Sequence, residues 1–388
     1  MKRNLILLAA VLTAAFAMAQ RSAEAQAVIN ILKQLSGQKC IICSMANVNW
    51  NTAEADNVHQ WTGKYPAMTT FDFIHAPYSK DVNPYGWLDY SDMTIVKDWW
   101  QQGGIVSCMW HWLMPTGQGQ NMSFYTNETN FDPTDILHPE SDGYKRMVKD
   151  MDQIASYFQQ MKELGIPVVW RPLHEAAGNS NNYPGGTGWF WWGSKGGDVF
   201  KALWRFMYNY FTQTKGLDNL IWVWNGGIND DSWYPGDEYV DVVGDDYYGN
   251  SLSTLGNSYQ HLTTSFPTKL VALTECGHSG NNRLPSLKAI WQAGQRWVWA
   301  MPWYDYNYNS QSNPTPSSHD YYTWFTEAMQ QDIAVDRAAM KQLLEQQTAI
   351  HHPTAATLPT APAYNLQGQR VGPSHRGIVI TNGKKVIQ

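Results

Sequence analysis

Short apolar runs alternate with longer amphipathic segments along most of the chain. Within each run the apolar residues are continuous rather than alternating, which is typical of parallel strands buried on both faces. The runs are Cys40–Met45, Met68–Ile74, Ile105–Trp110, Pro167–Arg171, Leu220–Trp224, Val240–Asp246, Leu270–Glu275 and Trp297–Met301. Eight such strands separated by helices predict an α/β fold, a single (β/α)8 barrel of the TIM type.

The segments between the runs support this prediction, with two irregularities. Tyr144–Leu164 carries apolar residues at three- and four-residue steps and is followed by Gly165, which predicts a helix that ends there. Only about fifteen residues separate the fifth and sixth runs, so we expect that helix to be reduced or missing. The long polar segment Pro115–Pro139 lies after the third run, where barrel enzymes build their active sites.

Two of the predicted strands end in a glutamate. The fourth run leads to Glu175 and the seventh ends at Glu275. Strands four and seven face each other across a barrel, and glycoside hydrolysis needs two carboxyl groups on either side of the scissile bond. For either glutamate alone, a helix cap or an arginine pair would be the better explanation. The two together predict a catalytic acid and a nucleophile or base.

Other strand ends carry residues suited to the same chemistry. His111 lies between two tryptophans after the third strand, where it can bind a sugar hydroxyl or pack as a core histidine. A tyrosine at the end of the sixth strand, such as Tyr248, can donate a hydrogen bond to the nucleophile. Trp303 follows the eighth strand as a stacking surface. Arg171, four residues before Glu175, can orient a carboxylate and lower its pKa.

Composition narrows the choice of ligand. The net charge is -6 and the basic residues are not clustered, which argues against a nucleic-acid partner. The chain has 20 Trp and 21 Tyr, more than burial alone explains, although an aromatic core accounts for part of them. Sugar rings stack on aromatic side chains and present hydroxyls to polar neighbours. The composition therefore favours a polysaccharide as the partner. We expect the protein to be a monomer.

The two ends of the chain are expected to lie outside the barrel. Residues 1–19 combine a basic start, an apolar run and Ala17-Met18-Ala19, which predicts a signal peptide and a protein that is secreted, periplasmic or at the cell surface. A membrane anchor is the alternative, and no other segment is long enough to span a membrane. The catalytic domain then covers residues 20–350, and residues 351–363 form a linker rich in Pro, Thr and Ala.

Residues 364–388 form a short tail with a hairpin signal at Asn382-Gly383. The motifs YNLQGQRV at 364–371 and NGKKV at 382–386 resemble the C-terminal tails of exported Bacteroidetes proteins, which implies a role in export or surface attachment. A terminus without a role is the alternative. In the barrel, Cys40, Cys43, Cys108 and Cys276 are expected to be buried free thiols, although export would permit disulfides.

Several motifs together resemble glycoside hydrolase family 26, which consists mainly of β-mannanases. The fourth strand leads into RPLHEAAG at 171–178, and WFWWG follows at 189–193. WHW at 110–112, DVVG at 241–244 followed by Asp246 and Tyr248, the strand of Glu275, and Trp303 extend the similarity. The resemblance covers roughly residues 28 to 347, the whole predicted barrel.

This resemblance implies a barrel of the clan of retaining glycosidases, with catalytic glutamates on strands four and seven. Glu175 would be the acid/base and Glu275 the nucleophile of an endo-acting enzyme that cleaves β-1,4 bonds in mannan, glucomannan or galactomannan. No cofactor or metal is implied. The substrate-binding residues would be His111, His174, Trp189, Asp246, Tyr248 and Trp303, supported by Arg171.

One departure from the family pattern and three alternatives remain. Residues 179–187 form an Asn- and Gly-rich insertion beside Glu175, predicted to be a mobile loop. The chain can also be a family relative that acts on another β-glycan, such as a β-1,3-xylan or a mixed-linkage glucan. A glycan-binding protein without activity would not need both glutamates. A barrel lyase or isomerase usually carries phosphate-binding glycines or metal ligands, which the strand ends lack.

Overall fold

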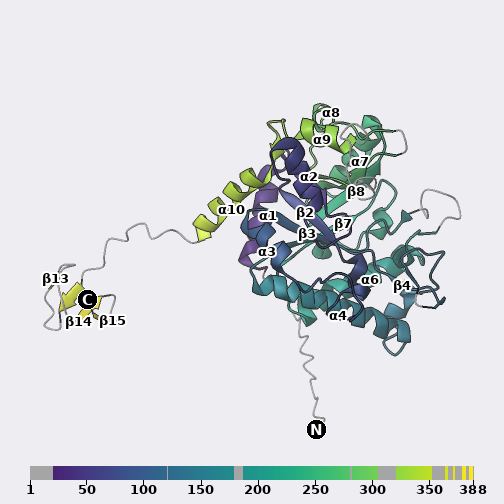
Figure 1. The fold of residues 1–388 in the computed structure, drawn as a ribbon, viewed down its shortest axis with the longest axis horizontal. Coiled ribbons are helices and arrows are strands. Elements are labelled where there is room, and N and C mark those ends of the chain that lie inside the picture. The colour runs from purple at the N-terminus through teal and green to yellow at the C-terminus, as the bar shows by residue number, and fades with distance from the viewer. Residues whose placement is uncertain are drawn as a thin grey trace, which may run out of the picture. The chain divides into compact units, whose positions relative to one another are not determined.

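Eight parallel strands close into a barrel in the computed structural model (Figure 1). Their hydrogen-bonded order is β10-β9-β8-β7-β6-β3-β2-β1, and β10 pairs with β1 through Ile41 and Trp299 to complete the ring. The strands are β1 (Cys40–Met45), β2 (Met68–Asp72), β3 (Ile105–Met109), β6 (Val168–Arg171), β7 (Leu220–Asn225), β8 (Val242–Tyr248), β9 (Leu270–Gly277) and β10 (Trp299–Pro302). The predicted (β/α)8 barrel is confirmed.

The structure describes residues 21–119, 121–178, 187–279, 282–304 and 320–351, and short strands between 363 and 387. The predicted signal peptide, nearly all of the linker and nearly all of the insertion at 179–187 lie outside these residues. The chain divides into two compact units, Met1–Leu344 and Glu345–Gln388.

Helices surround the strands on the outside of the barrel (Figure 1). They are α1 (Ala23–Leu35), α2 (Ala53–Thr62), α3 (Thr94–Gln101), α4 (Asp142–Glu163), α6 (Gly197–Asn209), α7 (Leu252–Ser265), α8 (Leu287–Gln292), α9 (Asp320–Ala328) and α10 (Arg337–His351). The start of α1 is anchored where β7 and β8 begin, because Arg21 pairs with Asp241 at 2.5 Å and the Ser22 amide donates to Asp218. Its apolar side chains share one buried cluster with residues of the barrel strands.

Helix α4 buries the apolar side chains that recur along it at three- and four-residue steps. The Ser141 side chain accepts a hydrogen bond from the Tyr144 amide and caps the helix, which extends the predicted Tyr144–Leu164 by about half a turn at its start. Its apolar face is buried against the sheet, and the Phe158 ring contacts the ring of Trp170 on β6 at 4.9 Å between centroids. Burying this stripe holds the strand that leads to Glu175 in place.

The connections at the carboxyl ends of the strands are irregular where the sequence indicates. Between β7 and β8 the chain forms two 3-10 turns, η5 (Asp231–Trp233) and η6 (Asp237–Tyr239), in place of a helix. The long segment after β3 contains the hairpin β4 (Met114–Pro115) and β5 (Met122–Ser123), followed by η2 (Pro133–Leu137). The remaining short elements are η1 (Phe73–Tyr78), η3 (Trp191–Gly193), the π-helical turn η4 (Tyr210–Thr214) and β11 (Ala334–Val335), which pairs with β1.

The second unit is a small antiparallel sheet with the order β13-β12-β14-β15. Its strands are β12 (Ala363–Asn365), β13 (Arg370–Val371), β14 (Ile378–Thr381) and β15 (Lys384–Ile387). Strands β14 and β15 are antiparallel, with Thr381 opposite Lys384, and the sequence predicts a hairpin turn at Asn382-Gly383 between them. The turn residues themselves are outside the described part of the chain.

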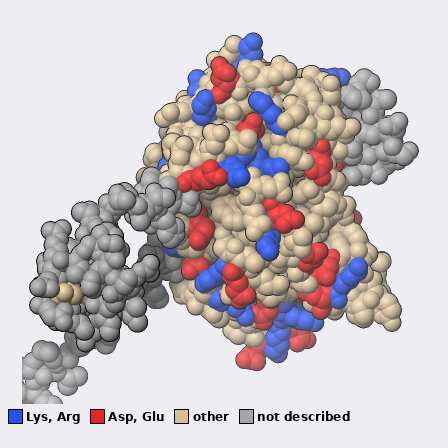
Figure 2. All heavy atoms as spheres, turned by 60° about the vertical axis from the view of Figure 1, so that its left-hand side comes forward, with Lys and Arg blue, Asp and Glu red and all other residues tan. Residues whose placement is uncertain are grey.

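The distribution of charged side chains on the surface agrees with the expectation that basic residues are not clustered. Charged side chains of both signs are interspersed on the face shown in Figure 2. Among the described helices, none combines the length and the apolar character needed to cross a bilayer.

All four cysteines lie in the described part of the barrel, where they are free and buried. Burial raises the pKa of the Cys40 thiol to about 12, so it stays protonated.

We expect Phe158→Ala to lower the free energy of unfolding by about 3–5 kcal/mol, because it leaves a cavity against Trp170. Ser156→Ala on the exposed side of the same helix is the control and should change it by less than about 0.5 kcal/mol. Urea unfolding followed by tryptophan fluorescence measures both. Equal losses in the two variants would contradict the packing described here.

We expect removal of all residues after Gln347 to leave the melting temperature of the barrel nearly unchanged. The compact unit that contains the barrel ends at Leu344, and its buried Met340 and Leu344 remain in the shortened chain. Differential scanning calorimetry of the full and shortened proteins tests this. A shortened protein that fails to fold would mean that the second unit contributes to the barrel.

Candidate active site

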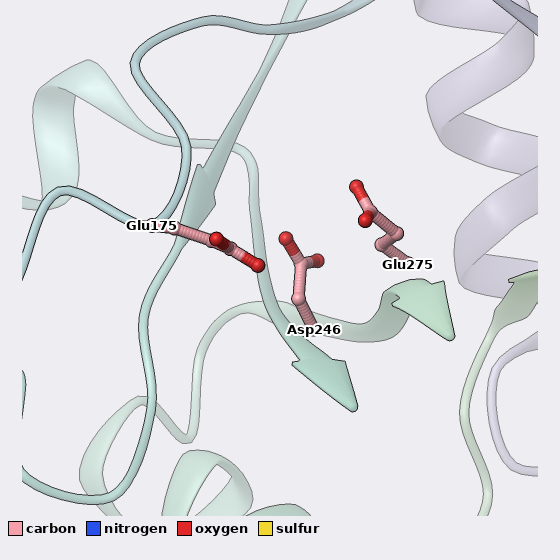
Figure 3. Close-up of side chains that lie close together, drawn as sticks. All are labelled: Glu175, Asp246 and Glu275. Carbon is pink, nitrogen blue, oxygen red and sulfur yellow. The ribbon is translucent and has the colours of Figure 1, made fainter. Parts of the chain in front are cut away.

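Three carboxylates meet at the carboxyl ends of the barrel strands (Figure 3). Glu175 lies just after β6, Asp246 lies on β8 and Glu275 lies near the end of β9. One oxygen of each lies within 4.8 Å of one oxygen of each of the others. Figure 3 shows the Glu175 side chain pointing toward Asp246, whose carboxyl group lies between the two glutamates. The structure therefore brings together the two glutamates that the sequence singles out, with an aspartate between them.

Arg171 holds two of these carboxylates. From the end of β6 its Nη1 donates to Asp246 Oδ2 at 2.7 Å and its Nη2 donates to Glu275 Oε2 at 2.6 Å. The guanidinium is almost fully buried, with 3% of the side chain exposed. A buried cation needs paired anions, and Arg171 finds them on two other strands. Its own pKa is raised, although burial opposes this, because Asp246 and Glu275 stabilise the charged form.

Neutral donors complete this network on both sides of Arg171. The Tyr248 hydroxyl donates to Glu275 Oε1, so both oxygens of Glu275 accept a hydrogen bond. The Thr274 hydroxyl donates to Asp246 Oδ1 at 2.8 Å and lies 3.2 Å from the Asn225 side-chain amide. Arg171 and Tyr248 thus contact carboxylates, as the sequence led us to expect, whereas Thr274 was not expected in the site.

The backbone around Glu175 is held in an uncommon conformation. Leu173 and Glu175 have φ angles of 50° and 49°, in the left-handed region that residues other than glycine rarely adopt. The amide of Glu175 donates to Asn225 Oδ1 at 2.7 Å, and Asn225 is the last residue of β7. Such strain persists only where the surroundings enforce it, so Asn225 acts as a brace for the Glu175 backbone.

The tryptophan-rich segment after the insertion forms the other brace. Trp192 Nε1 donates to the backbone oxygen of His174 at 2.9 Å. A Cβ atom at Gly193 would lie 1.8 Å from the backbone oxygen of Ala176, so only glycine permits this close approach. Trp191 Nε1 donates to the backbone oxygen of Trp112, which joins the segment to the loop after β3.

His111 and His174 form a pair behind the carboxylates. His111 Nδ1 donates to Asp72 Oδ2 at 2.5 Å, and the His111 amide donates to Asp72 Oδ1 at 3.0 Å. Burial opposes ionisation of Asp72, but these contacts outweigh it and lower its pKa. His111 Nε2 faces His174 Nε2 at 3.2 Å. Burial keeps the pKa of His174 well below its usual value, so His174 is neutral.

The remaining predicted residues line the mouth. An open cavity of about 280 Å³ lies between the ends of β6, β7 and β8. Its lining includes Trp189, Asn225, Asp246 and Glu175. Trp303, 7% exposed, follows β10 and lies 6.0 Å from His111 between ring centroids. His174 is only 2% exposed, so of the predicted binding residues it has the least surface available to a ligand.

The surroundings of Glu175 and Glu275 shift the pKa values of the two carboxyl groups differently. Burial and the charges of Asp246 and Glu275 raise the pKa of Glu175 well above its usual value, against opposing effects of Arg171 and Trp189. Burial and Asp246 also raise the pKa of Glu275, to about 7, while Arg171 and Tyr248 limit the rise. Glu275 is therefore surrounded by more groups that favour its ionised form than Glu175 is. Of these two carboxyl groups, Glu175 is the one that carries a proton.

The same three carboxylates are the one group of acidic, His or Cys side chains in the described residues with the spacing of metal ligands. Arg171 already provides a positive charge to Asp246 and Glu275 at hydrogen-bonding distance. The group therefore has an internal counter-ion, and its geometry is suited to proton transfer and nucleophilic attack.

Sequence analysis missed Asp72, Asn225 and Thr274. Asp72 ends β2 and Asn225 ends β7, so both occupy the strand-end positions by which Glu175 and Glu275 were recognised. The second predicted run continued past Asp72 to Ile74, and the fifth stopped one residue before Asn225. A search for polar residues at every strand end would have found these two. Thr274, inside an apolar strand, carries no such signal.

Comparisons with known proteins agree with this geometry. The sequence model of glycosyl hydrolase family 26 matches residues 17–326. A mannan endo-1,4-β-mannosidase of Thermothelomyces thermophilus is 33% identical over 292 residues, which are 73% of this chain and 55% of that protein. A Bacillus subtilis protein of the same name is 33% identical over 239 residues, 59% of this chain and 62% of that one. The chain thus spans little more than half the length of these relatives.

A solved structure extends the similarity to three dimensions. The family 26 domain of an endo-β-mannanase/endo-β-glucanase from Prevotella bryantii superimposes with a TM-score of 0.75 at 35% identity, covering 83% of this chain and 98% of that domain. The family match spans most of the barrel and contains Glu175, Asp246 and Glu275. The chain therefore belongs to glycosyl hydrolase family 26.

Proposed function

We propose that the protein is an endo-acting β-mannanase that hydrolyses β-1,4-mannosidic bonds in mannan, glucomannan or galactomannan with retention of configuration. The observation that carries the proposal is the short separation of Glu175 and Glu275, whose nearest oxygens lie within 4.8 Å. Retaining glycosidases keep their two carboxyl groups about 5–5.5 Å apart, whereas inverting enzymes need about 6.5–9.5 Å to admit a water molecule.

In the first step Glu275 attacks the anomeric carbon and Glu175 donates its proton to the leaving oxygen. Arg171 and Tyr248 donate to the two oxygens of Glu275 and so hold one carboxylate lone pair in a defined direction. The bond from the anomeric carbon to the leaving oxygen breaks as the bond to Glu275 forms. The product is a glycosyl-enzyme and a shortened chain with a free hydroxyl.

In the second step the ionised Glu175 removes a proton from water, which attacks the anomeric carbon and releases Glu275. Glu175 can change roles because its pKa depends on the charge of its neighbours. Once Glu275 is esterified it no longer carries a negative charge, so one of the causes that raise the pKa of Glu175 is removed.

The preference for mannan rests on the relatives, several of which are named mannan endo-1,4-β-mannosidase. The remaining binding roles follow from position. Trp189 lines the open cavity and Trp303 contacts the ring of His111, whose two ring nitrogens are already engaged by Asp72 and His174. His174 supports His111 from behind. Residues 1–19 support export of the protein as a signal peptide.

The substrate is tested with a panel of mannan, glucomannan, galactomannan, xylan and lichenan, with product lengths read by chromatography. We expect a series of short oligosaccharides from the three mannans, because an endo-acting enzyme cuts within the chain. Cleavage of lichenan or xylan alone would reject the mannanase assignment. Release of a single product from chain ends would reject endo action.

The two glutamates are distinguished by replacing each with alanine. We expect Glu275→Ala to lose activity on every substrate, because the covalent bond cannot form. Glu175→Ala should fail on mannan yet release dinitrophenol from a dinitrophenyl mannobioside in a burst, because that leaving group needs no proton. The second step then stalls for want of a base.

Azide needs no base and provides the deciding control. Added to Glu175→Ala, it should restore turnover and give a mannobiosyl azide of retained configuration, which NMR identifies. An azide product of inverted configuration, or normal turnover of mannan by Glu175→Ala, would require the two roles to be exchanged or abandoned.

The pH dependence of kcat/KM tests the hydrogen bond from Tyr248. The nucleophile must be ionised, so activity falls as the pH drops through the pKa of Glu275, about 7. Tyr248→Phe removes a donor that favours the ionised form. We expect this acidic limb to move upward by about one to two pH units, because a hydrogen bond to a charged group contributes about 1.5–3 kcal/mol.

Tyr234→Phe is the matched control for this experiment. Its hydroxyl also donates to a carboxylate, that of Asp237 at 2.8 Å, but on the outer surface. Its profile should coincide with that of the unchanged protein. The alkaline limb, where Glu175 loses its proton, should persist in both variants. An acidic limb that stays in place in Tyr248→Phe would show that the tyrosine does not control the charge of Glu275.

A further inference from the structure

The chain returns to the catalytic centre immediately after the insertion at 179–187. Trp189 lines the open cavity next to Glu175. On the other side of the insertion, a Cβ at Gly178 would lie 2.9 Å from the Trp189 ring, so the residues that flank the insertion meet at this tryptophan. Whatever fixes the backbone of Trp189 therefore fixes an aromatic ring beside the proposed acid/base.

Thr126 holds the backbone of Trp189 on both sides. It lies after β5, in the long loop that follows β3. Its side-chain hydroxyl donates to the backbone oxygen of Gly188 at 2.6 Å, and its amide donates to the backbone oxygen of Trp189 at 2.7 Å. These oxygens belong to the two peptide groups that flank the Trp189 Cα. Because peptide groups are planar, holding both of them fixes the φ and ψ angles of Trp189, and these angles limit its side-chain rotamers.

Gly188 is also confined from the side of Glu175. A Cβ at Gly188 would lie 2.7 Å from the backbone oxygen of Ala176, the residue after Glu175, and 2.9 Å from that of Gly193. The backbone of Gly188 is thus packed against the chain that carries Glu175, and the Thr126 hydroxyl holds it there. A shift of Gly188 would move Trp189 and loosen the contact with Ala176.

The Trp189 indole acts on the charge of Glu175. It favours the ionised form and so opposes the rise in the pKa of this carboxyl group. The indole Nε1 is buried, and no hydrogen bond with another described residue competes for it. The charged groups around Glu175 are Asp246, Glu275 and Arg171, which come from three barrel strands and not from the loop after β3. The position of the indole can therefore change without disturbing them.

We propose that Thr126 is a positioning residue for the proposed acid/base: its hydroxyl fixes the backbone of Gly188 and Trp189 and so keeps the Trp189 indole beside Glu175. This deepens the proposed function and rests on it. Thr126 is not among the described residues that line the cavity, so it acts through Trp189 and not on the substrate. Glu175 changes its charge twice in each proposed turnover, and a fixed indole gives it the same neighbour in both steps.

Thr126→Val tests the role of the hydroxyl. Valine keeps the branched shape and the amide bond to Trp189, but it cannot donate to Gly188. We expect kcat/KM on mannan to fall about five-fold, as for the loss of one hydrogen bond. The alkaline limb of the pH profile, which reports Glu175, should move upward by about half a pH unit, because a group that favours the ionised carboxylate is displaced. The acidic limb, which reports Glu275, should stay in place.

Two further variants separate positioning from stability. Thr126→Ser keeps the hydroxyl and should recover the activity and the pH profile of the unchanged protein. Thr129→Val is the matched control, because Thr129 lies in the same loop and its hydroxyl donates to the backbone oxygen of Pro115 at 2.8 Å. It should lower the melting temperature at least as much as Thr126→Val, since Thr129 is the more buried of the two, but leave both limbs in place. If either valine variant fails to fold, alanine at the same position takes its place.

Crystal structures of the variants give a measurement that does not depend on activity. We expect the Trp189 ring to be displaced, or to occupy two orientations, in Thr126→Val. It should remain in place in Thr126→Ser and Thr129→Val.

The outcomes separate the positioning role from the proposed function. If the unchanged protein cleaves mannan but the alkaline limb of Thr126→Val does not move, or its Trp189 ring remains in place, the positioning role is rejected and the function stands. Equal shifts of the limb in Thr126→Val and Thr129→Val also reject it, because they indicate a loss of loop stability alone. If the unchanged protein cleaves no mannan, the proposed function fails, and the crystal structures alone decide whether Thr126 positions Trp189.

Discussion

The buried guanidinium of Arg171 is the constraint on which the arrangement of the site depends. An arginine cannot lose its charge inside a protein, so burying it requires anions at fixed positions. Here the anions come from two different strands, Asp246 on β8 and Glu275 on β9, while Arg171 itself ends β6. The contact therefore couples the positions of three strand ends. It also allows three carboxylates to lie within 4.8 Å of one another, which repulsion would otherwise oppose.

The different roles proposed for Glu175 and Glu275 follow from this unequal pairing. Glu275 accepts hydrogen bonds from Arg171 and Tyr248. The pKa of Glu175, in contrast, is determined mainly by burial and by nearby negative charge. What fixes Glu175 is its backbone, braced by Asn225 and by the segment around Trp192. The proposed nucleophile, Glu275, is thus positioned through its carboxylate, and the proposed acid, Glu175, through its main chain. That difference leaves the acid free to exchange its proton.

The sequence predicted the barrel because buried parallel strands have a continuous apolar pattern that needs no knowledge of neighbours. The first run, Cys40–Met45, has the bounds of β1, and the two glutamates were recognisable because they follow such runs. The left-handed conformation of Glu175 was not predictable, since it results from contacts with residues distant in the chain. The pairing of His111 with Asp72 likewise depends on the register of β2 and β3, where Asp72 lies opposite Met109.

The four thiols of the barrel have a consequence for how the protein acquires its fold. Cys40, Cys43, Cys108 and Cys276 are buried and unpaired, so the barrel gains its stability from packing and ion pairs and not from covalent cross-links. Folding then needs neither an oxidant nor a disulfide isomerase. The folded barrel therefore contains no disulfide whose reduction would weaken it, and its stability once folded does not depend on the reducing power of the surrounding compartment.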